Sequence, residues 1–409
     1  MRGTYWLVIA AVLFIVSLVL HQVPLLLISL LLLLVRGVTR LWERYSFARV
    51  EYRRHLSASH VFFGEEVQFE VEVANRKPLP LPWIEIDEEV PVEVTLPKAT
   101  TSPSYQKGRL LLTTLLSLGW YHRVKRRYTV LCQQRGCFTF GPTRIRSGDL
   151  FGFSRQEMEI RDVDRLTVYP RLVPLEKLGI PSKQPLGDIR TRRYIFQDPI
   201  LTLGVRDYHY GDSLKRIHWK TTARLGRLQT KVFEPTTTID MGIFLDVRTM
   251  KPPAWGIIPR LTELGITAAA SIANHAMAEG YRVGLYVNQR RKFSGEHVRI
   301  PPSQHTDQLL HILEALAQIH TSIETMPIAR LVPREGRNLP WGSTLVVITA
   351  VPTDALLSTL VRMKRAGRSV ALIQVGGAGL SMRKNGLNVY HIPDGVMWHD
   401  LETLSIRGE

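Results

Sequence analysis

The sequence predicts three folded parts in order: a pair of membrane-spanning helices, a small antiparallel β-sandwich and a C-terminal doubly wound α/β domain. Two long apolar runs fill residues 1–40, which predicts the helices. Apolar and polar residues alternate with period two through much of 41–164, which predicts strands. From 239 to 409, short apolar runs alternate with helical patterns, which predicts the α/β domain. Residues 165–238, rich in Pro and Gly, are expected to form an extended connector.

The first element predicted is a transmembrane helical hairpin. "TYWLVIAAVLFIVSLVL" and "PLLLISLLLLLV" are separated by "HQVP". A continuous helix over 4–35 would be about 48 Å long, whereas a bilayer core is about 30 Å thick. Two helices with a turn at the far interface fit better, because His21, Gln22 and Pro24 are costly at membrane depth. A secretory signal peptide is the alternative, but no small-residue cleavage site precedes the second apolar run.

The positive charges predict how this hairpin is oriented. Arg2 precedes the first run, the connecting turn carries no Lys or Arg, and six arginines follow the second run between positions 36 and 54. The positive-inside rule therefore predicts a two-pass protein of the cell membrane, with both ends and all later domains in the cytoplasm. The whole chain has 53 Lys and Arg against 36 Asp and Glu, a net charge of +17. Anionic lipid headgroups are one partner that this excess predicts.

The β-sandwich is predicted by several short strands. In "VQFEVEV", Val67, Phe69, Val71 and Val73 alternate with polar residues, and "VPVEVTL" and "VKRRYTVL" alternate similarly. "RGCFTFGPTRIRSGD" is expected to form a hairpin followed by a turn. Nothing in this part resembles a catalytic constellation. The two cysteines, Cys132 and Cys137, lack neighbours at metal-ligand spacing and are expected to be reduced thiols.

The C-terminal part shows strands and helices in alternation. "MGIFLDV" is a continuous apolar run, as expected of a buried parallel strand. Leu261, Leu264, Ala268, Ile272 and Ala276 then recur at helical spacing up to Gly280. Further strands are expected at "YRVGLYV", "STLVVIT" and "SVALIQVG", helices at "DQLLHILEALAQI" and "TDALLSTLVRMKRAG", and a last pair at "NVYHI" and the tail after Gly395. Ligands of such domains bind at the carboxyl ends of strands.

The stretch "VRDYHYGDSLKRIHWKTTARLGRLQTKVFE" resembles the signature of the family called "domain of unknown function 58". The upstream "RGCFTFGPTRIRSGDLFGF" is similar to a second block of that family, and the order of the predicted parts agrees over nearly the whole chain. The signature positions that match are Arg206, Tyr208, Gly211, Asp212, Arg216, Ile217, Trp219, Ala223, Arg224, Lys231, Phe233 and Glu234.

The resemblance implies that the α/β domain is similar to a von Willebrand factor A domain. Many such domains hold a divalent metal through Asp-x-Ser-x-Ser after the first strand, because hard oxygens must converge on the ion. Here Asp246 is present, but Arg248 and Met250 replace the two hydroxyls, and Ala350 stands where a second Asp is expected. We therefore expect a degenerate site in which Arg248 pairs with Asp246. A metal-dependent ligand-binding protein remains an alternative.

Three interpretations of the basic signature compete. As a nucleic-acid surface, it would use Tyr208, Tyr210 and Trp219 for stacking, but Asp207, Asp212 and Glu234 interrupt its charge. As a hydrolase site, it would use His209 or His218 as base, Asp212 to orient the base, and Ser213 or Thr221 as nucleophile. As a structural element, Gly211 and Asp212 would form a turn that starts a short helix, capped by Asp212 or Ser213.

The structural interpretation is the one the residues favour. Arg206, Arg216 and Arg224 would bind carboxylates or carbonyls, and Ile217 and Trp219 would enter the core. Such an element would lock the neighbouring domains together or hold a partner against them.

The prediction is therefore a membrane-anchored scaffold or adaptor rather than an enzyme, with no cofactor and no nucleic-acid partner. The resemblance implies two protein partners, a MoxR-type AAA+ ATPase and a transglutaminase-like membrane protein, and a bacterial host.

Overall fold

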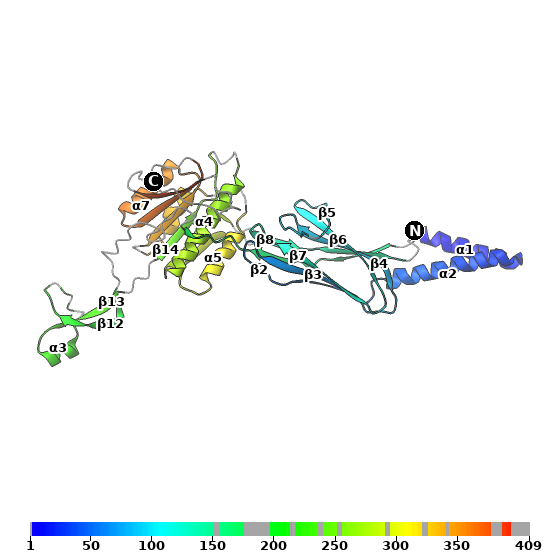
Figure 1. Ribbon diagram of the computed structural model, residues 1–409, viewed down its shortest axis with the longest axis horizontal. Helices are drawn as coiled ribbons and strands as arrows, with labels where there is room; N and C mark the ends of the chain where they lie inside the picture. The colour runs from blue at the N-terminus through cyan, green and yellow to red at the C-terminus, as the bar shows by residue number, and fades with distance from the viewer. Residues whose placement is uncertain are drawn as a thin grey trace. The chain divides into compact units, whose positions relative to one another are not determined.

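The computed structural model describes residues 2–97, 99–149, 155–175, 197–210, 212, 214, 217–235, 240–251, 256–290, 295–320, 326–340, 343–377 and 387–393. For residues 2–10, 197–203 and 232–235 it describes the backbone. The chain divides into two compact units, Met1–Tyr169 and Pro170–Glu409. Figure 1 shows the helices and strands of each unit.

Two helices begin the first unit. α1 (Arg2–Val19) and α2 (Val23–Tyr45) contact one another and are joined by a short turn. Pro24 lies in the first turn of α2, where its missing N–H costs nothing. Within the described part of the chain, α2 is the one helix long and apolar enough to cross a membrane. The structure therefore supports one membrane-spanning segment of the expected hairpin.

The rest of the first unit is a β-domain with three sheets. Their strand orders are β1-β3-β7, β10-β9-β4-β6-β5 and β2-β11-β8. All pairings are antiparallel except that of β2 with β11. The strands are β1 (Val50–Leu56), β2 (His60–Val61), β3 (Glu66–Asn75), β4 (Leu81–Pro91), β5 (Thr101–Pro103), β6 (Arg109–Leu118), β7 (Arg123–Leu131), β8 (Gly136–Phe140), β9 (Thr143–Gly148), β10 (Arg155–Ile160) and β11 (Asp164–Val168).

The period-two strand predicted at 67–73 lies within β3. Its four apolar residues are buried and join one core with Phe140 and Ile145, while Gln68 stays exposed. Strand 124–131 also forms, as β7. The core is made by the apolar face of each strand, as the alternation predicted.

Two details of the predicted β-domain are wrong. β8 and β9 do not form a hairpin, because β8 pairs with β11 whereas β9 pairs with β4 and β10. The chain passes from one sheet to another at Gly141, whose φ of 93° is a value that glycine adopts without steric strain. The strand expected from "VPVEVTL" is also displaced: β4 ends at Pro91, and the chain beyond it turns.

The second unit contains a six-stranded sheet of order β16-β15-β14-β17-β18-β19. Only β16 is antiparallel to its neighbour; the other pairings are parallel. The elements are β14 (Asp240–Leu245), α4 (Pro259–Ala278), β15 (Arg282–Arg290), β16 (His297–Ser303), α5 (Gln308–Ala317), α6 (Ile328–Gly336), β17 (Thr344–Thr349), α7 (Asp354–Arg365), β18 (Ser369–Val375) and β19 (Asn388–Ile392).

Helices cover both faces of this sheet, as expected of a doubly wound α/β domain. Phe244 packs with residues of α6 and α7. Leu245, which points to the opposite face, lies near Gly265 of α4. The predicted strands and helices of this domain therefore form, and β16 and α6 are additional. The tail after Gly395 lies outside the described residues.

The expected extended connector is wrong for its second half. β12 (Gln197–Asp207) pairs antiparallel with β13 (Gln229–Pro235), and α3 (Trp219–Leu225) lies between them. We call these strands, α3 and the described residues of the intervening loop the signature module.

Candidate functional site

The signature module contains a turn held by Arg206 and Asp212. Arg206 Nη2 donates to Asp212 Oδ1 at 2.7 Å, and the backbone N–H of His209 donates to Asp212 Oδ2 at 3.0 Å. Thr230 Oγ1, across the strand pair, lies 3.4 Å from the same oxygen. The His209 hydrogen bond and then Arg206 hold the pKa of Asp212 below its usual range. The carboxylate therefore fixes the turn and stays ionised at neutral pH.

The helix of the module starts later than the sequence suggested. His218, rather than Asp212 or Ser213, is its N-cap: Nδ1 accepts the backbone N–H of Thr221 at 3.1 Å. Gly226, with φ of 65°, ends the helix in the left-handed conformation. The α-helix spans Trp219–Leu225, so the predicted cap was placed too early in the chain.

Among the residues that the structure describes in this module, the hydrolase arrangement is not brought together; Ser213, one of the two expected nucleophiles, lies outside them. Thr221 Oγ1 does lie 2.9 Å from His218 Nδ1. That nitrogen, however, also accepts the backbone N–H that caps α3. Asp212 directs its oxygens to Arg206, His209 and Thr230 rather than to His218. The third member of a catalytic triad is thus engaged elsewhere.

The module buries one predicted residue and exposes others. Ile217 is 5% exposed, as expected. Trp219 is 67% exposed, so the expectation that it enters the core is wrong, because the first turn of α3 carries it on the outer face. Arg224 is exposed on the same helix. Tyr210 is fully exposed and Leu214 is 67% exposed.

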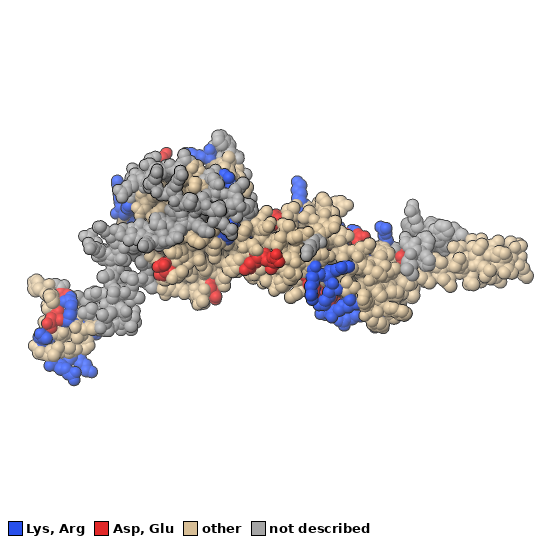
Figure 2. All heavy atoms as spheres, in the orientation of Figure 1, with Lys and Arg blue, Asp and Glu red and all other residues tan. Residues whose placement is uncertain are grey.

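The remaining signature residues are less informative. Tyr208 is half-buried, and its backbone N–H donates to Leu228 O at 3.0 Å. Lys231 is half-buried on β13, opposite Val205. Gly211 and Arg216 lie outside the described residues, as does the side chain of Glu234. Figure 2 shows basic and acidic side chains next to one another over this module, in agreement with the Arg206–Asp212 and Arg227–Asp207 ion pairs.

A second polar site lies at the carboxyl ends of the central strands of the α/β sheet. Asp246 follows β14, Asn288 lies in β15 and Thr349 ends β17. Asn288 Nδ2 donates to Asp246 Oδ1 at 2.6 Å, and Thr349 Oγ1 donates to Oδ2 at 3.0 Å. Arg248 Nε lies 3.4 Å from Oδ1, the pairing expected from the sequence. These are the strand ends at which ligands of this fold class bind.

The donors around Asp246 do not fit a divalent metal. Its side chain is 1% exposed, and both oxygens accept hydrogen bonds from protein groups. Arg248 adds positive charge where a cation would sit, and Met250 offers a thioether, too soft for magnesium. Burial raises the pKa of Asp246, opposed by Arg248 and the other donors. Elsewhere too, the described residues include no group of three or more His, Cys, Asp or Glu placed to hold a metal.

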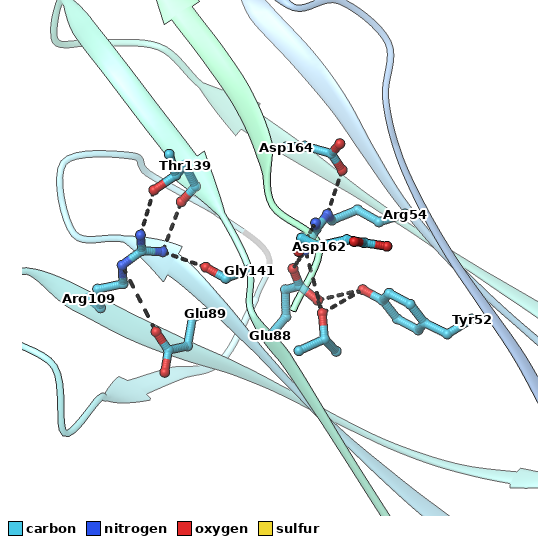
Figure 3. Close-up of polar contacts among 10 residues, drawn as sticks. Tyr52, Arg54, Glu88, Glu89, Arg109, Thr139, Gly141, Asp162 and Asp164 are labelled. Carbon is cyan, nitrogen blue, oxygen red and sulfur yellow. Dashed lines mark hydrogen bonds and ion pairs between the residues drawn. The ribbon is translucent and has the colours of Figure 1, made fainter. Parts of the chain in front are cut away.

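A third polar cluster lies inside the β-domain, and Figure 3 shows it. Arg54 forms an ion pair with Glu88, and Arg54 Nε donates to Asp164 Oδ2 at 2.6 Å. Tyr52 and Thr143 donate to the other oxygen of Glu88. Burial raises the pKa of Glu88 above that of a free carboxyl.

Beside this cluster, Arg109 binds backbone carbonyls of two residues (Figure 3). Its Nη1 donates to Thr139 O at 2.9 Å and to Gly141 O at 2.8 Å. Glu89 Oε2 lies 4.0 Å from Arg109 Nε. The sequence predicted no site in this domain, although "IEIDEEV" places Asp87, Glu88 and Glu89 within an apolar strand.

Comparison with known proteins supports the family suggested by the signature. Residues 204–362 match the family model described as "Protein of unknown function DUF58". The chain is 24% identical over 360 residues to "Uncharacterized protein YeaD" of Bacillus subtilis (strain 168), which covers 85% of this chain and 81% of that protein. Both findings support assignment to the DUF58 family.

Solved structures add little. The CARDB domain of the PF1109 protein from Pyrococcus furiosus is 13% identical over 29% of this chain and 89% of its own, with a TM-score of 0.20. A cohesin module from Clostridium perfringens is 10% identical over 29% of this chain and 94% of its own, also with a TM-score of 0.20. Similarity this low carries no argument about the fold or function of this chain.

Proposed function

We propose that this protein is a membrane-anchored adaptor that holds a cytoplasmic protein through its signature module. The observation that carries the proposal is the exposure of Trp219, Tyr210 and Leu214 on an element in which the side chains of Arg206, Asp212 and His218 are already bonded within the module. The arginine, aspartate and histidine side chains shape the module, and the aromatic side chains remain available to a partner.

Exposed aromatic residues of this kind fit a protein interface. A Trp or Tyr side chain can bury about 150–250 Å² of surface, and these residues and Arg dominate the binding energy of interfaces. Around Trp219, the exposed Lys220 and Arg224 supply a basic rim. The partner surface proposed is therefore an apolar pocket with acidic residues around it.

Attachment to the membrane is the second part of the proposal. α2 is long and apolar enough to cross a bilayer. We propose that α1 crosses it as well, so that the chain is a two-pass protein of the cell membrane with its folded domains in the cytoplasm. The arginines that follow the apolar run of α2 support this orientation.

The α/β domain would contribute binding rather than catalysis. Its strand order places an antiparallel edge strand, β16, beside parallel strands, an arrangement that supports the proposed von Willebrand A-like fold. The hydrogen bonds to Asp246 support a structural role for the degenerate metal site. Resemblance to the family implies a MoxR-type AAA+ ATPase as the docked protein and a transglutaminase-like membrane protein as a further component.

The test is co-purification of the ATPase with the full-length protein from detergent-solubilised native membranes. The Tyr210→Ala and Trp219→Ala variants should recover much less ATPase than the unmodified protein. Trp120→Ala is a matched control, because Trp120 is 73% exposed but lies in the β-domain. Equal recovery with all variants, or no ATPase with any, would overturn the adaptor proposal.

The same side chains could stack on single-stranded nucleic acid, so that alternative is tested in parallel. Because Arg206 and Arg227 are paired with acids, we expect weak binding that vanishes at physiological salt. Tight binding with a steep salt dependence that Trp219→Ala abolishes would favour nucleic acid instead.

A further inference from the structure

The turn between β6 and β7 exposes two aromatic side chains that the adaptor function does not use. Trp120 is 73% exposed and Tyr121 is 69% exposed. Tyr121 has a φ of 50°, in the left-handed region that a bulky residue seldom adopts. An exposed aromatic pair on a constrained turn suggests an apolar environment around it.

This turn is fastened by buried Asn75. Asn75 Nδ2 donates to Gly119 O at 2.8 Å and to Leu79 O at 2.9 Å, and its backbone N–H donates to His122 O at 2.9 Å. The same side chain is 1% exposed, so these hydrogen bonds are shielded from water. The orientation of the turn is therefore fixed by the body of the β-domain.

The turn is also linked to the end of α2. Tyr121 N donates to Lys77 O at 3.3 Å, and Lys77 Nζ donates to Ser46 O at 2.6 Å. Ser46 is the C-cap of α2. Nearby, Arg76 N donates to Arg49 O at 3.0 Å. The turn that carries Trp120 and Tyr121 thus lies beside the C-terminal end of α2.

The length of α2 places this point near a membrane surface. Starting from Val23, a core of about 30 Å is crossed by about 20 residues of helix, which ends near Trp42. Arg36, inside that span, directs Nη1 toward Glu43 Oε1 at 3.4 Å, two turns further along the helix. An arginine that reaches toward the interface from within a span is expected behaviour in a bilayer.

We propose that Trp120 and Tyr121 insert into the headgroup region of the bilayer that α2 enters and hold the β-domain against it. This inference rests on the membrane attachment proposed above. Trp and Tyr favour this zone because one end of each ring is apolar and the other can bind water. Among the nearby charges, Arg49 is exposed, whereas Arg76 is paired with Glu51 and Arg123 with Glu72. The positive charge of Arg49 beside the turn would favour anionic phospholipid.

The experiment uses the full-length protein reconstituted into vesicles that contain phosphatidylglycerol and lipids brominated on their acyl chains. The emission of Trp120 is obtained by subtracting the spectrum of Trp120→Ala from that of the unmodified protein. Bromines near the headgroup should quench this component strongly, and bromines near the chain end should quench it less. The control is the emission of Trp219, obtained in the same way with Trp219→Ala. Bromolipid should not quench this emission, although Trp219 is similarly exposed.

Extraction with alkaline carbonate distinguishes failure of the membrane anchor from failure of the Trp120 and Tyr121 insertion. If the protein stays in the membrane but Trp120 is quenched by aqueous iodide and not by bromolipid, the insertion proposal is overturned and the anchor stands. If carbonate releases the protein, the anchor and the insertion fail together. Retention with selective quenching by shallow bromines supports the proposal.

Discussion

Arg54 and Glu88 form an ion pair in which the two side chains are 4% and 1% exposed. Arg54 lies in β1, Glu88 in β4 and the second acid, Asp164, in β11. These strands belong to three different sheets of the β-domain. One guanidinium therefore connects all three sheets through charge-assisted hydrogen bonds, which are stronger than neutral ones.

Arg54→Leu should lower the free energy of unfolding by about 3–5 kcal/mol, because it leaves Glu88 buried without a positive charge beside it. The measurement is urea unfolding of the detergent-solubilised full chain, followed by tryptophan fluorescence. Arg54→Met combined with Glu88→Leu should cost less than Arg54→Leu alone, since the double change removes the uncompensated charge.

A surface ion pair serves as the control for this experiment. Arg161 binds Glu159, and the two side chains are 87% and 39% exposed, so Arg161→Leu should cost about 1 kcal/mol or less. If Arg54→Leu costs no more than Arg161→Leu, Arg54 does not connect the sheets in the way described.

Gly141→Ala should also destabilise the β-domain. A Cβ at this position would lie 2.5 Å from Arg54 Nη1 and 2.7 Å from Asp162 O, and the φ of 93° disfavours any side chain. The two effects together should cost about 2–4 kcal/mol. Gly108→Ala separates them, because Gly108 has a φ of 77° but no atom within 4 Å of an added Cβ. Equal losses for both variants would show that contact with Arg54 is unimportant.

The sequence predicted the α/β domain well because its central strands are buried on both faces and appear as continuous apolar runs. Met241 and Phe244 of β14 illustrate this, since each is at most 1% exposed. β16 was missed because Pro301 and Pro302 fall within it, and Pro is expected only at edges, where β16 lies. α6 was missed for a similar reason, since Pro333 lies inside it.

The buried polar clusters could not be predicted in the same way. Glu88 and Arg54 are far apart in sequence, and a charged residue taken alone is expected at the protein surface. The register of β4 with β9 sets Glu88 opposite Thr143, and the packing of β1 against them brings Tyr52 and Arg54 to the same carboxylate. The orientation of Trp219 was likewise undetermined, because it depends on the residue at which α3 begins.

The degenerate metal site can be tested by restoring its hydroxyls. Arg248→Ser with Met250→Ser would recreate Asp-x-Ser-x-Ser from Asp246 onward and remove the competing guanidinium. Without metal, this variant should melt at a lower temperature than the unmodified protein, because Asp246 loses a partner. Excess magnesium should then raise its melting temperature, since a ligand that binds only the folded state stabilises it.

Two comparisons make this result specific. The unmodified protein should show no magnesium-dependent shift, because Arg248 and protein donors surround Asp246. Adding Asp246→Asn to the restored variant should remove the shift. A clear rise for the unmodified protein would mean that Arg248 moves aside and the native site binds metal.

The buried ammonium of Lys77, at the end of the β-domain next to α2, predicts that the free energy of unfolding depends on pH. Its side chain is 5% exposed, and burial lowers its pKa from 10.5 to about 8. Below pH 8 both folded and unfolded chains carry the proton, so the cost of burying the charge is present in full. Between pH 8 and 10.5 the unfolded chain binds more protons, so stability should rise with pH.

Lys77→Met isolates this contribution, because the other titrating groups are common to both proteins. From pH 8 to 10.5, the free energy of unfolding of the unmodified protein should rise by up to about 3 kcal/mol relative to Lys77→Met. Urea unfolding of the detergent-solubilised proteins at stepped pH provides the measurement. Parallel curves would show that the Lys77 ammonium retains its water shell in the folded protein.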